Sequence, residues 1–398
     1  MKLPHATLST LADFDPRGPR SGQLPEMELV DFLPMSSVDA EQLTARASEQ
    51  RPVGELLSGF TYFQSGDVLV AKITPCFENG KIAEARLNTE HGFGTTEFHV
   101  IRPHSDKLDS KYLTHFLRQP FVRLEGQRRM TGSAGQRRVP RDFLKELDIP
   151  LPSIVEQRRI AMILDKADAL RQKRRTALQI LDSLSQSLFL EMFGDPATNS
   201  KSMPAVALGD LFLEPPCYGS MTPPGERGRW TSLRVGNIQD WKLDLVDEKY
   251  IDLPADKVRR YSLKDGDIML ARAIASQDHL GKCIVVYPGE RRWAFDSHLM
   301  RLRLDLNRIL PEYLSAMFRT GGGRSLFLSV TRRSAVQFNV NTKEMASLRI
   351  PLALIESQQR FFNELSVAQH AELSLRRSAS EMDSLFLSLQ RQAFSGGI

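Results

Sequence analysis

The chain has 398 residues, of which 41% are hydrophobic and 25% charged, and its formal net charge at pH 7 is +5. This length and composition fit a globular protein of two or three domains and exclude a disordered chain. No apolar run approaches the length needed to span a bilayer, and the N-terminus lacks the apolar stretch of a signal peptide. The three cysteines are widely scattered, which argues against a disulfide framework or a cysteine metal site, so we expect a cytoplasmic protein.

The first 150 residues have the pattern of a mixed α and β module. Short segments punctuated by glycine and proline open it, and Gly66-Asp67 forms a turn before the apolar run Val68-Leu69-Val70, which predicts a strand. The stretch from Tyr112 to Phe121 has helical apolar spacing and follows Ser110, which we predict to be its N-cap.

A strongly basic segment closes this module. From Arg118 to Lys145 there are eight positive residues against only Glu125 and Asp142. Within it, the loop 128–140 combines two glycines, which allow close backbone approach, with arginines suited to guanine or phosphate and a glutamine suited to adenine. We predict DNA contacts from Arg128, Arg129, Thr131, Ser133, Gln136, Arg137 and Arg138. Lys72 and Thr74, after the predicted strand, form a weaker candidate pair because a positive residue at a strand end is common.

A single long helix is predicted next. Between Val155 and Phe193 no proline or glycine occurs, and apolar residues recur every three or four positions. At ~1.5 Å per residue such a helix spans about 55 Å, which is too long for the core of a small domain, so it acts as a spacer or a partner surface. Gly194-Asp195-Pro196 ends it.

The second half of the chain repeats the first. Gly66-Asp67 corresponds to Gly266-Asp267 at an offset of 200 residues, and Ile149-Pro150-Leu151 corresponds to Ile350-Pro351-Leu352 at an offset of 201. The repeated features are a strand at 268–270 and a helix at 313–318, which begins near Pro311. The sequence therefore predicts two copies of one module, related by an internal pseudo-twofold.

The basic loop is repeated as well. Its second copy supplies the candidate DNA contacts Arg332, Arg333, Ser334, Gln337, Asn339 and Asn341, and the exit of the second strand supplies Arg272. A lone basic run is more often a solvated surface. Its recurrence at the same point of both modules favours nucleic-acid binding instead.

A second long helix ends the chain. From Phe361 to Ala393 apolar residues follow a 4,3 spacing that is broken only at Glu372, and Gly396-Gly397 follows. Two helices of matched length, each ending one module, favour an antiparallel coiled-coil pair. The alternative is that each helix packs on its own domain.

The search for catalytic chemistry returns no assignment. The sequence contains no phosphate-binding loop of the P-loop type, no His-Glu-x-x-His and no Cys-x-x-Cys. Glu214-Pro215-Pro216-Cys217 resembles the Asp/Asn-Pro-Pro-aromatic signature of amino-methyltransferases but departs from it at both ends, so a proline-rich linker is the favoured interpretation. We assign no catalytic, cofactor-binding or metal-binding residue.

Several motifs together resemble a known family. Ile149-Pro150-Leu151-Pro152 with Glu156-Gln157, then a long helix and Met192-Phe193-Gly194-Asp195, is similar to the DNA-specificity subunit of type I restriction-modification systems. The resemblance covers essentially the whole chain. The second copy departs from the pattern, with Ala353 for proline and Ser357 for glutamate, while Gln358 is retained.

The resemblance implies an α+β protein with two pseudo-symmetric target-recognition domains separated by two long antiparallel coiled-coil helices. The implied division is 1–150 and 197–351 for the recognition domains, and 151–196 and 352–398 for the helices. In this family each domain reads one half of a split DNA site, and the helices set the spacing and dock two methyltransferase subunits, with nuclease-translocase subunits joining the complex. The subunit itself is expected to catalyse nothing and to bind no cofactor, while S-adenosylmethionine, ATP and Mg²⁺ belong to the partner subunits.

Two other functions stay open from the sequence. The first is a free-standing DNA methyltransferase or nuclease with duplicated DNA-binding domains, against which the missing cofactor loop counts. The second is a scaffold that binds any duplex through its basic loops, because nonspecific affinity is mostly electrostatic. The openings of the two modules, 1–60 and 201–260, diverge most, so we expect an asymmetric site.

Overall fold

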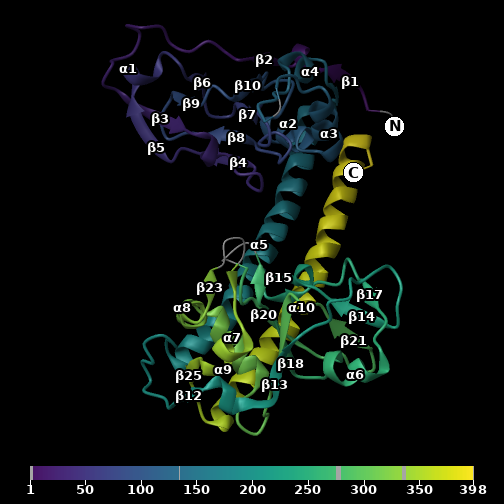
Figure 1. The fold of residues 1–398 in the computed structure, drawn as a ribbon. Coiled ribbons are helices and arrows are strands. Elements are labelled where there is room, and N and C mark those ends of the chain that lie inside the picture. Colours follow the sequence, from purple (N-terminus) through teal and green to yellow (C-terminus); the bar gives the residue numbers. More distant parts are fainter. Residues whose placement is uncertain (1–2, 134, 275–278, 334–337, 398) are drawn as a thin grey trace. The chain divides into compact units, whose positions relative to one another are not determined.

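The computed structural model describes residues 3–133, 135–274, 279–333 and 338–397, and the chain divides into two compact units (Figure 1). Unit 1 comprises Met1–Thr176 with Arg377–Ile398, and unit 2 is Ala177–Arg376. The boundaries fall inside the two long helices, α5 (Ile154–Phe193) and α10 (Ile355–Ser395), so each unit contains a part of both. The four-part division given by the sequence stays a prediction.

Unit 1 is built on a five-stranded sheet of order β2-β10-β7-β8-β4. Its strands are Ala12–Phe14, Phe98–Pro103, Val68–Ala71, Ile82–Arg86 and Thr44–Arg46, respectively. The predicted strand at 68–70 is confirmed as β7, and its alternation divides two cores. Val68 and Val70 join the cluster under the helices, while Leu69 and Ala71 join the cluster on the other face.

A second, four-stranded sheet of order β5-β3-β9-β6 lies in the same unit. Its strands are Glu49–Pro52, Leu29–Leu33, Gly92–Gly94 and Thr61–Phe63, and helix α1 is Val53–Leu56. Strand β1 (His5–Thr7) pairs with β11 (Asp148–Pro150), which joins the start of the module to its end.

The helices of unit 1 correct two predictions. Helix α2 is Ser110–Leu117, and its N-cap is Asp109, whose side chain accepts from the backbone N–H of Lys111 and Tyr112 at 3.0 Å each. The prediction of Ser110 as the N-cap is therefore wrong by one residue. The predicted helix to Phe121 is also interrupted, because α3 (Pro120–Arg128) starts anew at a proline that has no N–H to continue α2. Helix α4 is Arg141–Lys145.

Unit 2 repeats this architecture. A four-stranded sheet has the order β13-β22-β18-β20, a three-stranded sheet the order β17-β14-β21, and β12 pairs with β25. The four-stranded sheet consists of β13 (Phe212–Tyr218), β22 (Leu299–Leu304), β18 (Asp267–Ala271) and β20 (Cys283–Val286). The three-stranded sheet consists of β17 (Tyr250–Ile251), β14 (Trp230–Leu233) and β21 (Trp293–Phe295). The separate pair is β12 (Ala205–Ala207) and β25 (Arg349–Pro351). The helices are α6 (Ala255–Tyr261), α7 (Pro311–Arg319), α8 (Gly321–Ser329) and α9 (Thr342–Ser347), and Pro311 begins α7 as predicted.

The repeat extends to individual buried interactions. Asp67 accepts two hydrogen bonds from Arg102, at 2.8 and 2.7 Å, and Asp267 accepts the same pair from Arg303 at the same two distances. Each glutamine of the Ile-Pro-Leu region is wholly buried. Gln157 Oε1 accepts from the N–H of Asp109 at 2.9 Å, and its Nε2 donates to the carbonyls of Lys107 at 2.9 Å and Pro152 at 3.0 Å.

Gln358 makes the same three hydrogen bonds in unit 2. Its Oε1 accepts from the N–H of Leu310 at 2.8 Å, and its Nε2 donates to Arg308 O at 3.2 Å and Ala353 O at 2.8 Å. Each glutamine thus ties the first turn of a long helix to its own module. This explains why Gln358 is retained where the neighbouring proline and glutamate are not.

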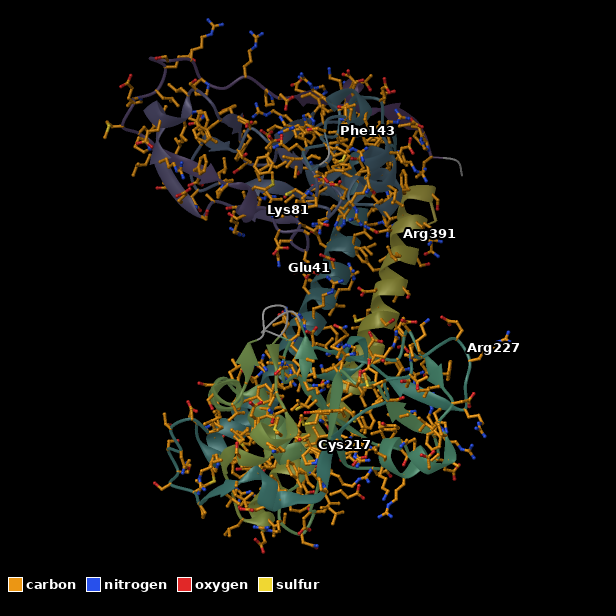
Figure 2. All side chains as sticks on the ribbon, in the orientation of Figure 1. Glu41, Lys81, Phe143, Cys217, Arg227 and Arg391 are labelled. Atoms are coloured by element: carbon orange, nitrogen blue, oxygen red, sulfur yellow. The ribbon has the colours of Figure 1, made fainter. Side chains whose placement is uncertain are left out.

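The segment Glu214-Pro215-Pro216-Cys217 is not a linker, so that prediction is wrong. It lies inside β13, and Cys217 is labelled in Figure 2. The strand is at the edge of its sheet and has register shifts at Glu214 and Cys217, so it accommodates prolines that lack an N–H. Glu214 Oε2 accepts from Arg301 at 3.0 Å and from Arg303 at 2.8 Å. Its carboxylate is therefore part of a structural ion-pair network.

The two long helices are confirmed, and Gly194 and Gly396 follow them in left-handed conformations, with φ of 73° and 82°. In unit 1, Arg171 Nε donates to Asp383 Oδ1 at 2.7 Å. In unit 2, the rings of Phe193 and Phe361 lie 5.6 Å apart. Residue numbers rise along α5 as they fall along α10, so the helices are antiparallel where they pack.

A loop of each module contacts the helix that follows that module, with opposite charges in the two units. In unit 1, Glu41, which is labelled in Figure 2, forms an ion pair with Arg175 of α5. In unit 2, Lys242 lies in the hairpin of β15 (Ile238–Gln239) and β16 (Lys242–Leu243), and its Nζ donates to Glu372 Oε1 of α10 at 2.5 Å. Glu372 also pairs with Arg376 at 2.7 Å. These contacts explain why the apolar register of α10 is broken at Glu372.

Candidate nucleic-acid interface

In unit 1, a hairpin brings the two predicted groups of DNA-contacting residues together. The backbones of Thr131 and Arg138 exchange hydrogen bonds of 3.0 and 2.8 Å, and Arg138 also forms an antiparallel bridge with Ile73. The N–H of Val139 donates to the carbonyl of Lys72 at 2.8 Å. The basic loop is therefore hydrogen-bonded to the residues that directly follow β7.

Unit 2 has the same hairpin in the same register. Its strands are β23 (Arg332–Arg333) and β24 (Phe338–Asn339), and β24 also pairs with β19 (Ala273–Ile274). Asn339 pairs with Arg332 and with Ala273, and the N–H of Val340 donates to Arg272 O at 3.1 Å. Ser334 and Gln337 lie outside the described residues, as do the side chains of Arg332 and Arg333.

The two registers identify equivalent positions. Arg138 of unit 1 corresponds to Asn339 of unit 2, and Thr131 corresponds to Arg332. Equivalent places on the two hairpins thus carry side chains of different hydrogen-bonding character. Arg138 offers only donors, whereas Asn339 offers both a donor and an acceptor.

A groove of about 730 Å³ in unit 1 is bordered by this hairpin. Its lining includes three of the predicted residues, Lys72, Thr131 and Arg138. It also includes Arg17, Tyr62 and Arg141, which were not predicted. Arg17 follows a proline in the glycine- and proline-rich opening of the chain, and that signal could have drawn attention to it. Arg141 Nη1 lies 3.2 Å from Asp15 Oδ2.

The guanidinium of Arg138 is the most firmly positioned of the predicted groups. Its Nε donates to Glu97 Oε2 at 3.0 Å, its Nη2 donates to Glu97 Oε1 at 2.8 Å, and its Nη1 donates to the carbonyl of Gln136 at 2.9 Å. These contacts leave 41% of the side chain exposed. The hydrogen bonds from Arg138 lower the pKa of Glu97 below its usual value despite partial burial, so the pair is charged at neutral pH.

Other predicted residues of unit 1 have different surroundings. Arg137 Nη2 donates to the carbonyl of Met130 at 3.0 Å, at the end of α3. Arg129 Nε donates to Glu125 at 3.2 Å, and its guanidinium lies 5.5 Å from the ring of Phe143, which is labelled in Figure 2. Arg128, Thr74, Ser133 and Gln136 are outside the lining of the groove. Thr74 Oγ1 donates to Glu78 at 2.5 Å.

Two further arginines of the basic run are structural. Arg118 donates to the carbonyl of Gln42 at 2.8 Å, and Arg123 donates to the carbonyl of Glu78 at 2.9 Å. Burial lowers the pKa of both guanidiniums. The eight positive charges of the run therefore do not form one continuous surface.

In unit 2, Arg272 and Asn341 also have intramolecular partners. Arg272 Nε donates to Ser297 O at 2.8 Å, and its guanidinium lies 3.9 Å from the ring centre of Tyr218. Asn341 is the N-cap of α9: its side chain accepts from Glu344 N at 2.8 Å, and Glu344 accepts from Asn341 N at 3.0 Å. This reciprocal cap holds Asn341 in place and occupies its carbonyl oxygen.

Within the described ranges, no group of three or more His, Cys, Asp and Glu side chains could hold a metal ion. The three cysteines are free, and Cys283 is buried. Among the residues of the same ranges, no helix has the length and apolar character to cross a membrane.

The comparisons with known proteins agree with this architecture. A family model described as the type I restriction modification DNA specificity domain matches residues 45–179, so the chain contains a domain of this class. The specificity subunit of the type I restriction enzyme EcoAI from Escherichia coli is 37% identical over 187 residues, which are 46% of this chain and 31% of that protein. The StySPI specificity subunit from Salmonella potsdam is 27% identical over 333 residues, which are 80% of this chain and 71% of that protein.

The chain is thus similar to DNA-specificity subunits of type I restriction-modification systems. The aligned part of the chain covers 31% of the length of the EcoAI specificity subunit and 31% of the length of the EcoEI specificity subunit from Escherichia coli.

Two solved structures share the fold. One, from a study of the assembly and conformational transition of the type I R-M system, has a TM-score of 0.61 at 17% identity and full coverage, 100%, of both chains. The S subunit of the type I system from M. genitalium has a TM-score of 0.56 at 13% identity, covering 98% of this chain and 96% of that chain. At these identities the likeness concerns the fold.

Proposed function

We propose that the chain is a non-catalytic subunit that binds double-stranded DNA and confers sequence specificity on a type I restriction-modification complex. Each unit reads one half of a split, asymmetric site. The observation that carries this proposal is the pair of hairpins, each bridged to the exit of the equivalent strand in the same register. Two recognition surfaces on one chain suit a bipartite site, and the different residues at positions 138 and 339 suit two different half-sites.

The long helices have a separate role in this proposal. They set the number of unspecified base pairs between the half-sites, and their outer faces dock two methyltransferase subunits, which the nuclease-translocase subunits join. Apolar side chains on the first part of α5 support docking, because Val155, Met162 and Leu170 are 73%, 51% and 53% exposed. S-adenosylmethionine, ATP and Mg²⁺ bind to the partner subunits and not to this chain.

The test is to co-express the chain with the methyltransferase subunit encoded beside it and to map adenine methylation of plasmid DNA by single-molecule sequencing. The expected result is one split motif with a fixed unspecified spacer. Methylated DNA without a split motif would contradict bipartite reading. Methylation by the chain alone would identify an enzyme instead, and a failure to form any complex would contradict the proposed partners.

A further inference from the structure

We propose that Arg138 reads a guanine in the half-site bound by unit 1 and that Glu97 is the residue that positions it. This inference rests on the proposed function and assigns one position of its DNA site. Arg138 donates three hydrogen bonds within the protein and still lines the groove.

The backbone supplies the first constraint. Arg138 is bridged to both Thr131 and Ile73, so its Cα is fixed at the centre of a small three-stranded arrangement. The second constraint is the Glu97 carboxylate, which grips Nε and Nη2, and the third is the Gln136 carbonyl, which accepts from Nη1. A long side chain that is free in solution loses conformational entropy when it binds, whereas this one is already ordered.

The N–H donors that remain on the guanidinium then decide what Arg138 can bind. A guanidinium has five N–H donors, and the three contacts use one on Nε, one on Nη2 and one on Nη1. One donor remains on each terminal nitrogen. The major-groove edge of guanine presents two acceptors, O6 and N7, and bidentate contact with arginine is its commonest specific contact. A neutralised Arg138–Glu97 pair also gains little from a phosphate, which favours a base over the backbone as its partner.

Unit 2 differs at both positions of this pair. The N–H of Lys72 donates to the carbonyl of Glu97 at 2.9 Å, and the N–H of Arg272 donates to that of His298 at 3.0 Å, so His298 stands at the place of Glu97. The place of Arg138 is taken by Asn339. Unit 2 therefore has no Arg–Glu pair at these two positions. The half-site that unit 2 binds is a control for base preference within the same molecule.

The experiment uses the purified complex of the full chain with its methyltransferase partner, after the split site has been mapped. Duplexes carrying each base pair at each position of both half-sites compete for binding at fixed salt. The variants are Arg138→Ala, Glu97→Ala, Glu97→Gln and the double variant Arg138→Ala with Glu97→Ala. Glu49→Ala is the matched control, because Glu49 pairs with Arg51 at 2.7 Å in the same unit, and both lie outside the lining of the groove and outside the predicted DNA contacts.

Arg138→Ala should lower the discrimination for a G·C pair at one position of one half-site by roughly 5- to 150-fold, and leave the other half-site unchanged. Glu97→Ala should relax the same position, Glu97→Gln should retain part of the preference, and the double variant should be no worse than Arg138→Ala. Glu49→Ala should leave every base preference unchanged.

Three results would overturn the inference. If wild-type complex reads a split site but Arg138→Ala keeps every base preference, the assignment of Arg138 fails while the proposed function stands. If Glu97→Ala relaxes a different position, or its effect adds to that of Arg138→Ala, then Glu97 does not act through Arg138. If the wild-type complex shows no base preference in either half, both the inference and the proposed function fail.

Discussion

Replacing the buried Gln157 by leucine, which has a similar volume, should destabilise unit 1 markedly. The change removes three hydrogen bonds and leaves the N–H of Asp109 and the carbonyls of Lys107 and Pro152 without this partner. Each lost bond costs about 0.5–1.5 kcal/mol, and a buried group that stays unsatisfied costs more, so we expect a loss of about 2–5 kcal/mol. Gln358→Leu should cost a similar amount in unit 2, because Gln358 makes the equivalent bonds.

The assay is urea and thermal unfolding of the full chain, followed by amide hydrogen exchange to locate the change. Each unit contains about 200 residues, so a loss of 3 kcal/mol corresponds to a decrease in Tm of roughly 6–12 °C. Hydrogen exchange should increase in unit 1 for Gln157→Leu and in unit 2 for Gln358→Leu. Gln359→Leu is the control, because its side chain is exposed and its Nε2 donates to Asn363 Oδ1 at 3.3 Å. A loss below about 1 kcal/mol for both buried glutamines would refute the reasoning.

Three further predictions follow from the buried charges and from the helices. Asp267→Asn should cost about 3–5 kcal/mol in urea unfolding, because it breaks an ion pair in which Asp267 and Arg303 are only 1% and 6% exposed. Asp67→Asn should cost less, because Arg102 is 30% exposed. Burial raises the pKa of Asp165, but hydrogen bonds from His115 and Lys111 outweigh it and bring the pKa below 3.8. Its contribution is therefore present above pH 3.8 and lost as the pH falls through the lower folded value, so Asp165→Asn should reduce stability at pH 7 and make little difference in strong acid. A heptad inserted into each long helix adds about 10 Å, or roughly three base pairs, to the spacer of the methylated site, and an unchanged spacer would contradict the role of the helices.

Much of the architecture could be predicted from short-range patterns. The run at 68–71 alternates between two cores, and the absence of proline and glycine from 155–193 left no point at which α5 could end. The N-cap was misplaced because Asp109 and Ser110 are both good caps and adjacent. Ser110 instead donates to Glu84 at 2.6 Å, a contact between residues distant in sequence that local patterns do not contain.

The candidate interface was harder to predict for the same reason. A basic run in a sequence shows the sign of its charges but not the partners of its side chains. In the structure, Arg118 and Arg123 donate hydrogen bonds to backbone carbonyls. Glu97 lies 41 residues from Arg138 along the chain, so no spacing rule connects the two. The prolines at 215 and 216 misled in another way, because an edge strand tolerates residues that a central strand does not.

The contact between Lys242 and Glu372 makes the pairing of module and helix unequal in a chain that contains one module twice. If the second module docked on the first helix, Lys242 would face Arg171, which stands where α10 has Glu372, and like charges would meet in a partly buried site. A chimaera in which the first helix follows the second module should therefore assemble well only when Arg171 is also replaced by glutamate.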